Sequence, residues 1–248
     1  MSEQIVVTGM VLTSMPVGDY DRRITILTTD RGKITAFARG ARRPNSSLIA
    51  GTSPFAFGEF EVYQGKSAYN VTKVSIKNHF RELTQDIDSI YYGFYFLEFC
   101  EYFCQENAPE KMMLKLLYQS IRALESKKFH RDLVRIVFEL KAMTFQGEGP
   151  EVTRCIKCRK TDELSWFSVK RGGCFCRGCQ KQVDGVAISD SARFTMEYVV
   201  KAPVEKLFTF QVTDEVRREL KALMNQYMGH YVRHTFKSLQ TIDEEFSQ

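Results

Sequence analysis

Five of the chain's seven cysteines lie within one short stretch, and four of them form two Cys-x2-Cys pairs. Cys155 and Cys158 make the first pair, and Cys176 and Cys179 make the second after a gap of 17 residues. Each pair can fold into a tight knuckle that presents two thiolates to one ion, so the spacing predicts a four-cysteine zinc site. Four thiolates leave no position for water, so we expect one structural rather than catalytic zinc.

Cys174 leaves an alternative open at this site. It lies two residues before Cys176, and in an extended segment the two share a face, so an exchange of ligand is one interpretation. We favour Cys176, because only it has the knuckle spacing to Cys179. A redox role would need a strand and a helix around each pair, whereas residues 166–173 indicate a short hairpin.

Basic residues form the second group with chemical meaning, and they gather in the first third of the chain. The net charge is +5; residues 1–81 hold 11 Lys and Arg against 6 Asp and Glu, whereas residues 82–248 hold 24 of each. A local positive field attracts polyanions, of which nucleic acid is the commonest in a cytosol. On charge alone, a basic solubilising face is the alternative.

Three arginines, Arg39, Arg42 and Arg43, leave a predicted strand and enter a loop that also contains Gly, Pro and Ser. Guanidinium groups suit phosphate oxygens and stack on bases, so we predict that these three bind DNA. Aromatic residues of the same region are candidates either for base stacking or for the core. The further predicted DNA-binding cations are Arg22, Arg23, Lys33, Lys66 and Lys73, and the aromatic candidates are Phe37, Tyr63 and Tyr69.

The elements that must position these residues change in type near residue 80. Five strand-like segments precede it without an ordinary helix between them, and such units often close into barrels because closure removes exposed edges. An OB-fold and an SH3-like barrel fit this pattern almost equally well. The predicted strands are residues 5–12, with a bulge or bend at Gly9, and residues 23–29, 34–39, 55–63 and 69–76.

Helical patterns follow the strands. The helix predicted over residues 87–105 is so rich in aromatics that it must be buried on more than one side. Further helices are predicted over residues 110–126, 131–145, 190–200 and 213–238, with a frayed tail over 243–248. The predicted domains are a DNA-binding barrel (1–80), a helical domain in two parts (81–150 and 186–248) and a zinc-binding module between them (151–185).

Several classes of protein do not fit the sequence. The N-terminus lacks the pattern of a signal peptide, and no uncharged apolar stretch is long enough for a membrane span, so we expect a cytoplasmic protein without membrane contact. No nucleotide-binding or hydrolase motif is present, so we expect no enzyme. A hydrolase with an unrecognised site and a zinc-ribbon RNA-binding or transcription factor are the alternatives.

The run Ala-Arg-Gly-Ala-Arg-Arg-Pro over residues 38–44, the strand from Phe55 to Tyr63 and the order of the segments resemble the bacterial DNA repair protein RecO family of recombination mediators. The resemblance covers essentially the whole chain. It implies a multidomain α and β protein with an N-terminal OB-fold and a helical domain interrupted by a zinc module.

The same resemblance implies a function. It implies non-enzymatic binding of single- and double-stranded DNA, annealing of complementary strands, and assistance in loading a recombinase onto strands coated by single-strand-binding protein. The partners it implies are RecR and single-strand-binding protein, and we expect such a protein at the nucleoid.

Overall fold

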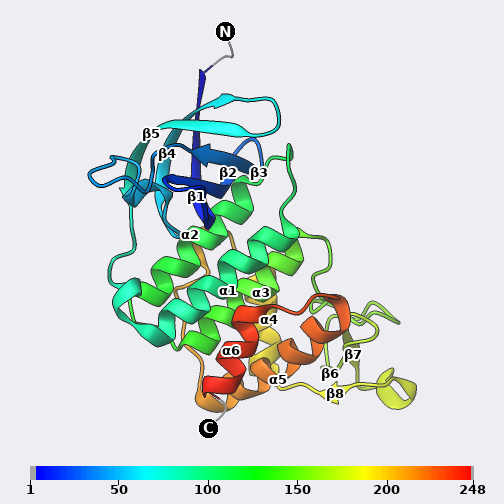
Figure 1. Cartoon of the computed structure of the whole chain (residues 1–248). Coiled ribbons are helices and arrows are strands. Elements are labelled where there is room, and N and C mark those ends of the chain that lie inside the picture. Colours follow the sequence, from blue (N-terminus) through cyan, green and yellow to red (C-terminus); the bar gives the residue numbers. More distant parts are fainter. Residues whose placement is uncertain (1–3, 247–248) are drawn as a thin grey trace. The chain divides into compact units, whose positions relative to one another are not determined.

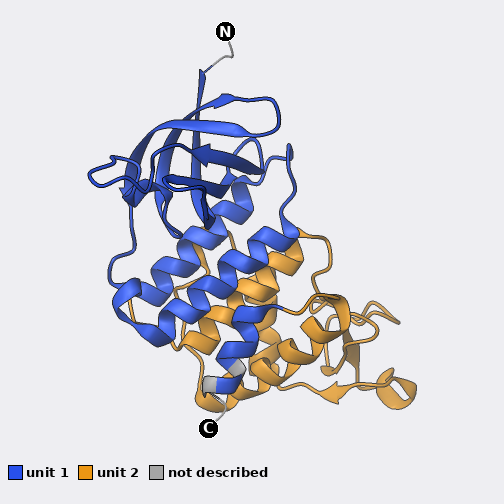
Figure 2. Ribbon diagram, viewed as in Figure 1, with its two compact units in different colours: residues 1–125, 236–248 blue, residues 126–235 orange. Residues whose placement is uncertain are grey.

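The computed structural model describes residues 4–246 and shows strands in the first third of the chain and helices in most of the rest (Figure 1). The chain forms two compact units, one of residues 1–125 with 236–248 and one of residues 126–235 (Figure 2). Over the described range, none of the helices is long and apolar enough to cross a membrane. The division into four domains at residues 80, 150 and 185 stays a prediction.

The strands of the first unit close into a barrel in the order β1-β2-β3-β5-β4. Neighbouring strands are antiparallel except β3 and β5, which pair in parallel at Ala36 with Tyr69 and at Phe37 with Asn70. A closed five-stranded unit with this crossover is an OB-type barrel, so the predicted fold class is confirmed. The strands are β1 (Gln4–Val17), β2 (Asp21–Thr28), β3 (Lys33–Ala38), β4 (Phe57–Gln64) and β5 (Tyr69–Asn78).

Strand alternation decides which side chains fill the barrel and which lie outside. Ile24 and Ile26 of β2 and Ala36 of β3 are fully buried in the barrel core. Successive side chains of a strand point to opposite faces, so Arg23, which precedes Ile24, and Phe37, which follows Ala36, lie on the outer face. Arg23 of β2 and Phe37 of β3 are opposite each other in the antiparallel pair, so a cationic residue neighbours an aromatic residue on this face.

Gly9 is needed for a close approach rather than for a bulge. The register between β1 and β2 shifts between Val11 and Thr13, so the irregularity lies beyond the predicted position. A Cβ atom on Gly9 would lie 2.5 Å from the carbonyl oxygen of Leu27, a contact that no side chain tolerates. Strand β1 also continues to Val17, past the predicted end.

Three helices belong to the first unit: α1 (Ile87–Phe103), α2 (Lys111–Glu125) and α6 (Lys237–Phe246). Asp86 caps the N-terminus of α1, because its side chain accepts a hydrogen bond from the backbone N–H of Ser89. Tyr95, Phe96 and Phe99 of α1 are fully buried, on more than one face of the helix, as its aromatic content predicted. Two short 3-10 helices, η1 (Ala50–Thr52) and η2 (Leu83–Gln85), complete this unit.

The predicted helix over residues 213–238 is wrong as a single element. Helix α5 (Asp214–Tyr231) ends where Val232 adopts an extended conformation, and α6 begins anew at Lys237. The carboxylate of Glu98 accepts hydrogen bonds of 3.0 Å from the backbone N–H groups of Lys237 and Ser238. The Glu98 carboxylate thus caps the N-terminus of α6. Because Glu98 is distant along the chain, the local sequence did not predict this helix start.

The C-terminal segment is helical further than predicted. Phe236 stacks on Phe99 of α1 with ring centroids 5.6 Å apart, and this contact anchors α6. Helix α6 reaches Phe246, so the prediction of a frayed tail is wrong up to that residue. Residues 247–248 of that prediction lie outside the described residues.

The second unit combines helices with a small sheet. Its helices are α3 (Arg131–Phe145), α4 (Asp190–Lys201) and α5, and its sheet has the order β7-β6-β8. Strands β6 (Leu164–Ser168) and β7 (Gly173–Cys176) form the predicted hairpin, joined by β8 (Val186–Ala187). Two 3-10 helices, η3 (Gln180–Gln182) and η4 (Val204–Lys206), lie in its connections.

The turn between β2 and β3 packs against the connection between α1 and α2. Lys33 N–H donates to the carbonyl oxygen of Gln105 at 2.9 Å, and Asn107 N–H donates to that of Arg31 at 3.0 Å. Gly32 has a φ of +62°, and a Cβ atom there would lie 2.1 Å from the Gln105 carbonyl oxygen. The contact between the two backbones therefore requires glycine in this turn.

Gly32 combines a positive φ with a close backbone contact, and the variants Gly32→Ala and Gly18→Ala separate the energetic effects of these two features. Gly18 has a φ of +55° with nothing within 4 Å of a built Cβ, so its substitution should cost about 1 kcal/mol of backbone strain alone. Gly32→Ala adds a steric clash and should cost at least ~1 kcal/mol more. Urea unfolding measures both, and equal losses would contradict the proposed close packing.

Candidate nucleic-acid interface and metal centre

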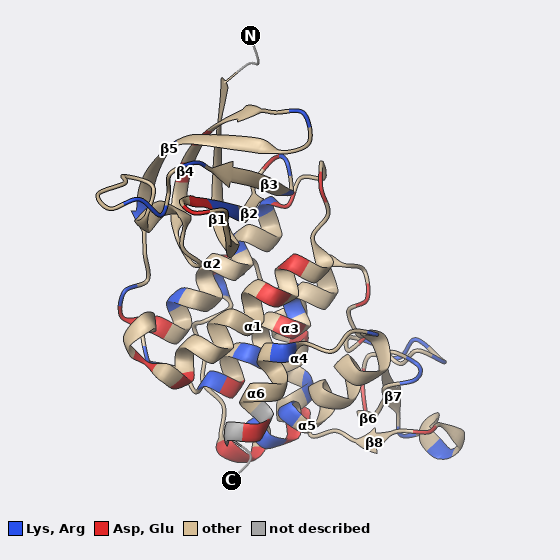
Figure 3. Ribbon diagram, viewed as in Figure 1, with Lys and Arg blue, Asp and Glu red and all other residues tan. Residues whose placement is uncertain are grey.

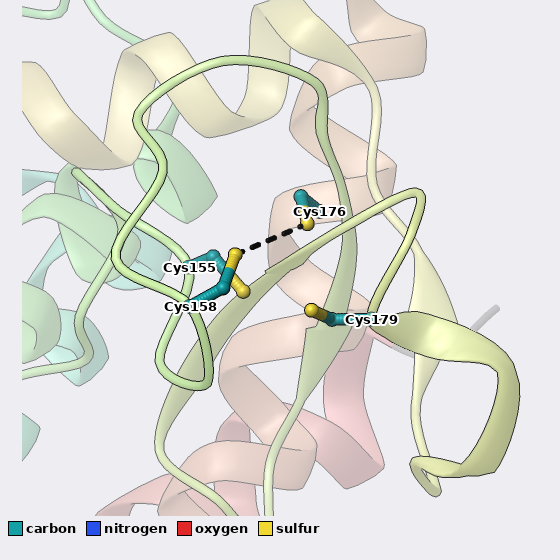
Figure 4. Close-up of side chains that lie close together, drawn as sticks. All are labelled: Cys155, Cys158, Cys176 and Cys179. Carbon is teal, nitrogen blue, oxygen red and sulfur yellow. Dashed lines mark hydrogen bonds between the residues drawn. The ribbon is translucent and has the colours of Figure 1, made fainter.

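The two cysteine pairs converge on one point. The Sγ atoms of Cys155, Cys158, Cys176 and Cys179 all lie within 4.8 Å of one another (Figure 4). The Cys158 and Cys176 sulfur atoms are 3.6 Å apart. A tetrahedron with metal–sulfur distances of about 2.3 Å has edges of about 3.8 Å, so the four sulfur atoms fit one tetrahedral ion.

Backbone hydrogen bonds form the two knuckles. Arg159 N–H donates to the carbonyl oxygen of Cys155, and Cys179 N–H donates to that of Cys176, both at 2.9 Å. Each bond closes a turn that directs two sulfur atoms to the same side. Cys176 is the last residue of β7, so the hairpin positions the second knuckle.

Cys174 lies outside the cluster. It is fully buried in β7, and its sulfur atom is not part of the four-sulfur group. Burial raises the pKa of its thiol to about 12, so this side chain behaves as a small apolar residue. The arrangement favours Cys176 over Cys174 in the cluster, as the knuckle spacing did.

The four clustered thiols do not ionise independently. Burial opposes ionisation of Cys155, but backbone N–H groups of Cys158, Cys176 and Lys157 outweigh it and lower the pKa of Cys155 to about 6. Hydrogen bonds with Cys158 and Cys176 raise the pKa of the Cys179 thiol to about 12. One thiolate forms readily and hinders the next, so a full set of thiolates needs a cation to balance its charge.

Serine variants test this cluster. Cys155→Ser removes one ligand, so we expect the bound metal to fall well below one ion per chain and the thermal midpoint to decrease, because metal-binding energy contributes to folding. Cys174→Ser should keep the full metal content. Elemental analysis of the purified proteins measures both. A metal-free wild type, or loss of metal from Cys174→Ser with retention by Cys176→Ser, would contradict the ligand set.

The loop after β3 exposes its arginines and buries its apolar residues. Ala41 and Leu48 belong to the barrel core, whereas Arg39, Arg42 and Arg43 are exposed. The loop thus has a defined conformation, although it contains no strand or α-helix. Because its apolar residues are anchored inside the barrel, its guanidinium groups are held at the surface.

Among the described residues, these three arginines have no acidic partner. Arg42 donates to the carbonyl oxygen of Gly18 at 3.2 Å, and the Arg43 guanidinium lies 5.3 Å from the ring centroid of Tyr20. In the part of the chain that the structure describes, no carboxylate lies within ion-pair distance of Arg39, Arg42 or Arg43. Their charge is therefore available to an external anion.

Arg22 has an internal role that the sequence did not reveal. Its Nη1 atom donates to the carbonyl oxygen of Ile49 at 3.0 Å and to the hydroxyl groups of Thr52 and Ser53 at 3.0 and 3.2 Å. The guanidinium thus fixes the far end of the loop that carries the three exposed arginines. Arg22 supports the basic loop, and its contact with DNA stays a prediction.

Lys33 and Lys73 also have partners within the first unit. The ammonium group of Lys33 donates to the backbone carbonyl oxygen of Glu101. Lys73 forms a surface ion pair of 3.2 Å with Glu61. Exposed pairs of this kind contribute little to stability, so Lys73 can change partner at low cost.

A polar cavity of about 510 Å³ opens on the outer face of the barrel. The predicted cations Arg23, Lys33 and Lys66 line it together with Phe37 and Tyr69 (Figure 3 marks Lys and Arg in blue). Sequence reasoning missed the other polar members because they come from the hairpin between β4 and β5 and from the connection after α1. These members include Gln64, Ser67, Glu106 and Asn107.

These features define a class of protein: an OB-type barrel with uncompensated exposed arginines, followed by helices and a four-cysteine cluster. Models of the N-terminal and C-terminal domains of Recombination protein O match residues 1–80 and 84–240. The DNA repair protein RecO of Acetivibrio thermocellus is 31% identical over 95% of this chain and 94% of its own length.

Two further relatives give the same result. The DNA repair protein RecO of Alkaliphilus metalliredigens is 31% identical, over 94% of this chain and 96% of the relative. That of Clostridium novyi is 27% identical, over 94% of this chain and 91% of the relative. The chain belongs to the RecO family of DNA repair proteins, as its sequence features predicted.

Proposed function

We propose that the chain is a recombination mediator that binds single- and double-stranded DNA through its barrel, anneals complementary strands and assists recombinase loading on protein-coated single strands. It acts at the nucleoid in the cytoplasm, with RecR and single-strand-binding protein as partners, and without covalent chemistry. The observation that carries this proposal is the set of exposed arginines, Arg39, Arg42 and Arg43, which are held on the barrel and have no acidic partner within the described range.

Annealing needs electrostatics more than chemistry. Two complementary strands repel each other through their phosphates, and base pairing supplies the driving force once they meet. Guanidinium groups that bind phosphates of both strands lower this repulsion. Phosphate contacts carry no sequence information, so binding and annealing should be independent of sequence.

We also propose that the metal is one zinc ion with a structural role. Four thiolate ligands are the set that structural zinc sites prefer, and they fill the tetrahedron without an open position for water. In this proposal Cys155, Cys158, Cys176 and Cys179 hold the ion, and the ion fixes two knuckles and the hairpin between them.

Substitution of the basic loop tests the DNA-binding proposal. The triple variant Arg39→Ala, Arg42→Ala, Arg43→Ala should fold, keep its metal, bind single-stranded DNA more weakly and anneal more slowly. Each lost phosphate contact lowers the salt slope by about 0.7, so the slope should be shallower by up to about 2. Unchanged affinity and salt dependence in a titration series would mean that the loop does not contact DNA.

We also propose that a groove of the second unit binds the tail of single-strand-binding protein. An apolar groove of about 640 Å³ lies on α4 and the segment after it. Phe194 and Tyr198 line it and are 59% and 38% exposed, although they are large apolar side chains. Lys201, Lys206 and Glu197 also line it, and Glu197 pairs with Lys201. Lys206 is therefore the lining cation that favours a short peptide that is both acidic and hydrophobic.

Peptide binding tests this groove. Phe194→Ala should weaken binding of a peptide with the acidic, hydrophobic tail sequence by about fivefold or more, which is the effect of losing an interface anchor of ~1 kcal/mol. Ile87→Ala is a matched control, because Ile87 is 70% exposed on α1 and does not line the groove. Fluorescence anisotropy with the full chain measures both, and equal affinities would place the peptide elsewhere.

A further inference from the structure

We propose that the cavity on the outer face of the barrel is a slot for one unpaired base of single-stranded DNA. The inference deepens the proposed function and depends on it, because it names the part of the DNA that enters the barrel's surface. Three observations support it: the position of Phe37, the nature of the other lining groups and the pattern of charge around them.

Phe37 lies where a stacking ring is needed. It is on the outer face of β3, half-buried, and it is not part of the barrel core, which is filled by Ile34, Ala36 and Ala38 of the same strand. Within residues 4–246 its ring contacts no other aromatic ring. Phe37 lines the cavity together with Arg23, and unpaired bases stack on aromatic side chains beside such cations.

Tyr69 has a different part in the cavity. Its ring packs against the barrel core, and its hydroxyl group lies 3.4 Å from Nη1 of Arg31. Tyr69 is therefore a fixed wall beside Phe37. The parallel pairing of β3 with β5 holds the two strand positions together, because Phe37 pairs with Asn70 and Ala36 pairs with Tyr69.

The polar lining favours a base over a phosphate inside the cavity. Gln64 and Asn107 offer amide donors and acceptors, which suit the edges of bases. The Glu106 carboxylate repels phosphate but accepts hydrogen bonds from the exocyclic amino groups of bases. Arg23 and Lys66 are exposed and form no ion pair within the described part of the chain, so they can hold the phosphates on either side of that base.

The basic loop extends the same surface. Phe37 lies on the outer face of β3, and Arg39 is exposed in the turn that follows the strand's last residue, Ala38. If one base of a single-stranded DNA stacks on Phe37, the phosphates of the neighbouring nucleotides can reach Arg39, Arg42 and Arg43. The volume of about 510 Å³ lies within the range of small-molecule sites, which is room for one base rather than a duplex.

This slot makes a distinctive energetic prediction. A base within a duplex has its faces stacked and its edge paired, so it cannot enter the cavity. Loss of the stacking ring should therefore weaken binding to single strands and leave binding to duplexes unchanged. Stacking releases no counterions, so the salt slope should also stay unchanged, in contrast to the loss of an arginine.

The experiment compares the variants Phe37→Leu, Phe37→Tyr and Tyr63→Leu of the full chain. Binding to a dT oligonucleotide and to a GC-rich duplex of equal length is measured over a series of salt concentrations. Phe37→Leu should bind the single strand about tenfold more weakly, which corresponds to ~1.4 kcal/mol of stacking, whereas Phe37→Tyr retains affinity. Tyr63→Leu is the matched control, because Tyr63, although the sequence made it a stacking candidate, is a half-buried residue of β4 outside the cavity.

The outcomes separate this inference from the proposed function. Equal single-strand affinity of Phe37→Leu and wild type, or equal losses on single strand and duplex, overturns the slot while DNA binding stands. A wild type without salt-dependent DNA binding overturns the proposed function itself. Photocrosslinking of the unmodified chain to an oligonucleotide with 5-iododeoxyuridine adds an independent readout. A crosslinked peptide that contains Phe37 supports the slot, and crosslinks confined to other peptides overturn it.

Discussion

Alternation along the strands of a closed barrel is the constraint on which the rest of this structure depends. Ile24, Ile26 and Ala36 fill the inside, and each inward residue forces its neighbours outward. The same packing that stabilises the barrel therefore places the exposed Arg23 and the half-buried Phe37 on its outer face. The core packing therefore also fixes the position of these outer residues, because a shift of the strand register by one residue would bury the charge of Arg23 in the core.

The same relation between buried anchors and exposed chemistry recurs in the loops. Ala41 and Leu48 reach into the barrel core, so the loop between them keeps its arginines at the surface. In the second unit, the two cysteine knuckles are closed by backbone hydrogen bonds, and the hairpin joins them. Both segments lack long regular elements, and both are held by a few residues at defined positions.

Local signals in the sequence predicted much of this fold, and the exceptions have a common cause. The five strands, the aromatic helix and the cysteine grouping follow from periodicity and spacing. The break after Tyr231 does not, because α6 begins where a carboxylate of α1, Glu98, meets its first N–H groups. The internal role of Arg22 and the contribution of Glu106 to the cavity likewise depend on residues that are distant along the chain.

The central claim is that the outer face of the barrel and its basic loop hold single-stranded DNA. Chemical modification of arginines by phenylglyoxal, read by mass spectrometry with and without an oligonucleotide, tests it most directly. Bound DNA should protect Arg23, Arg39, Arg42 and Arg43 from modification. Protection confined to arginines of the second unit, with those four equally reactive in both samples, would contradict it.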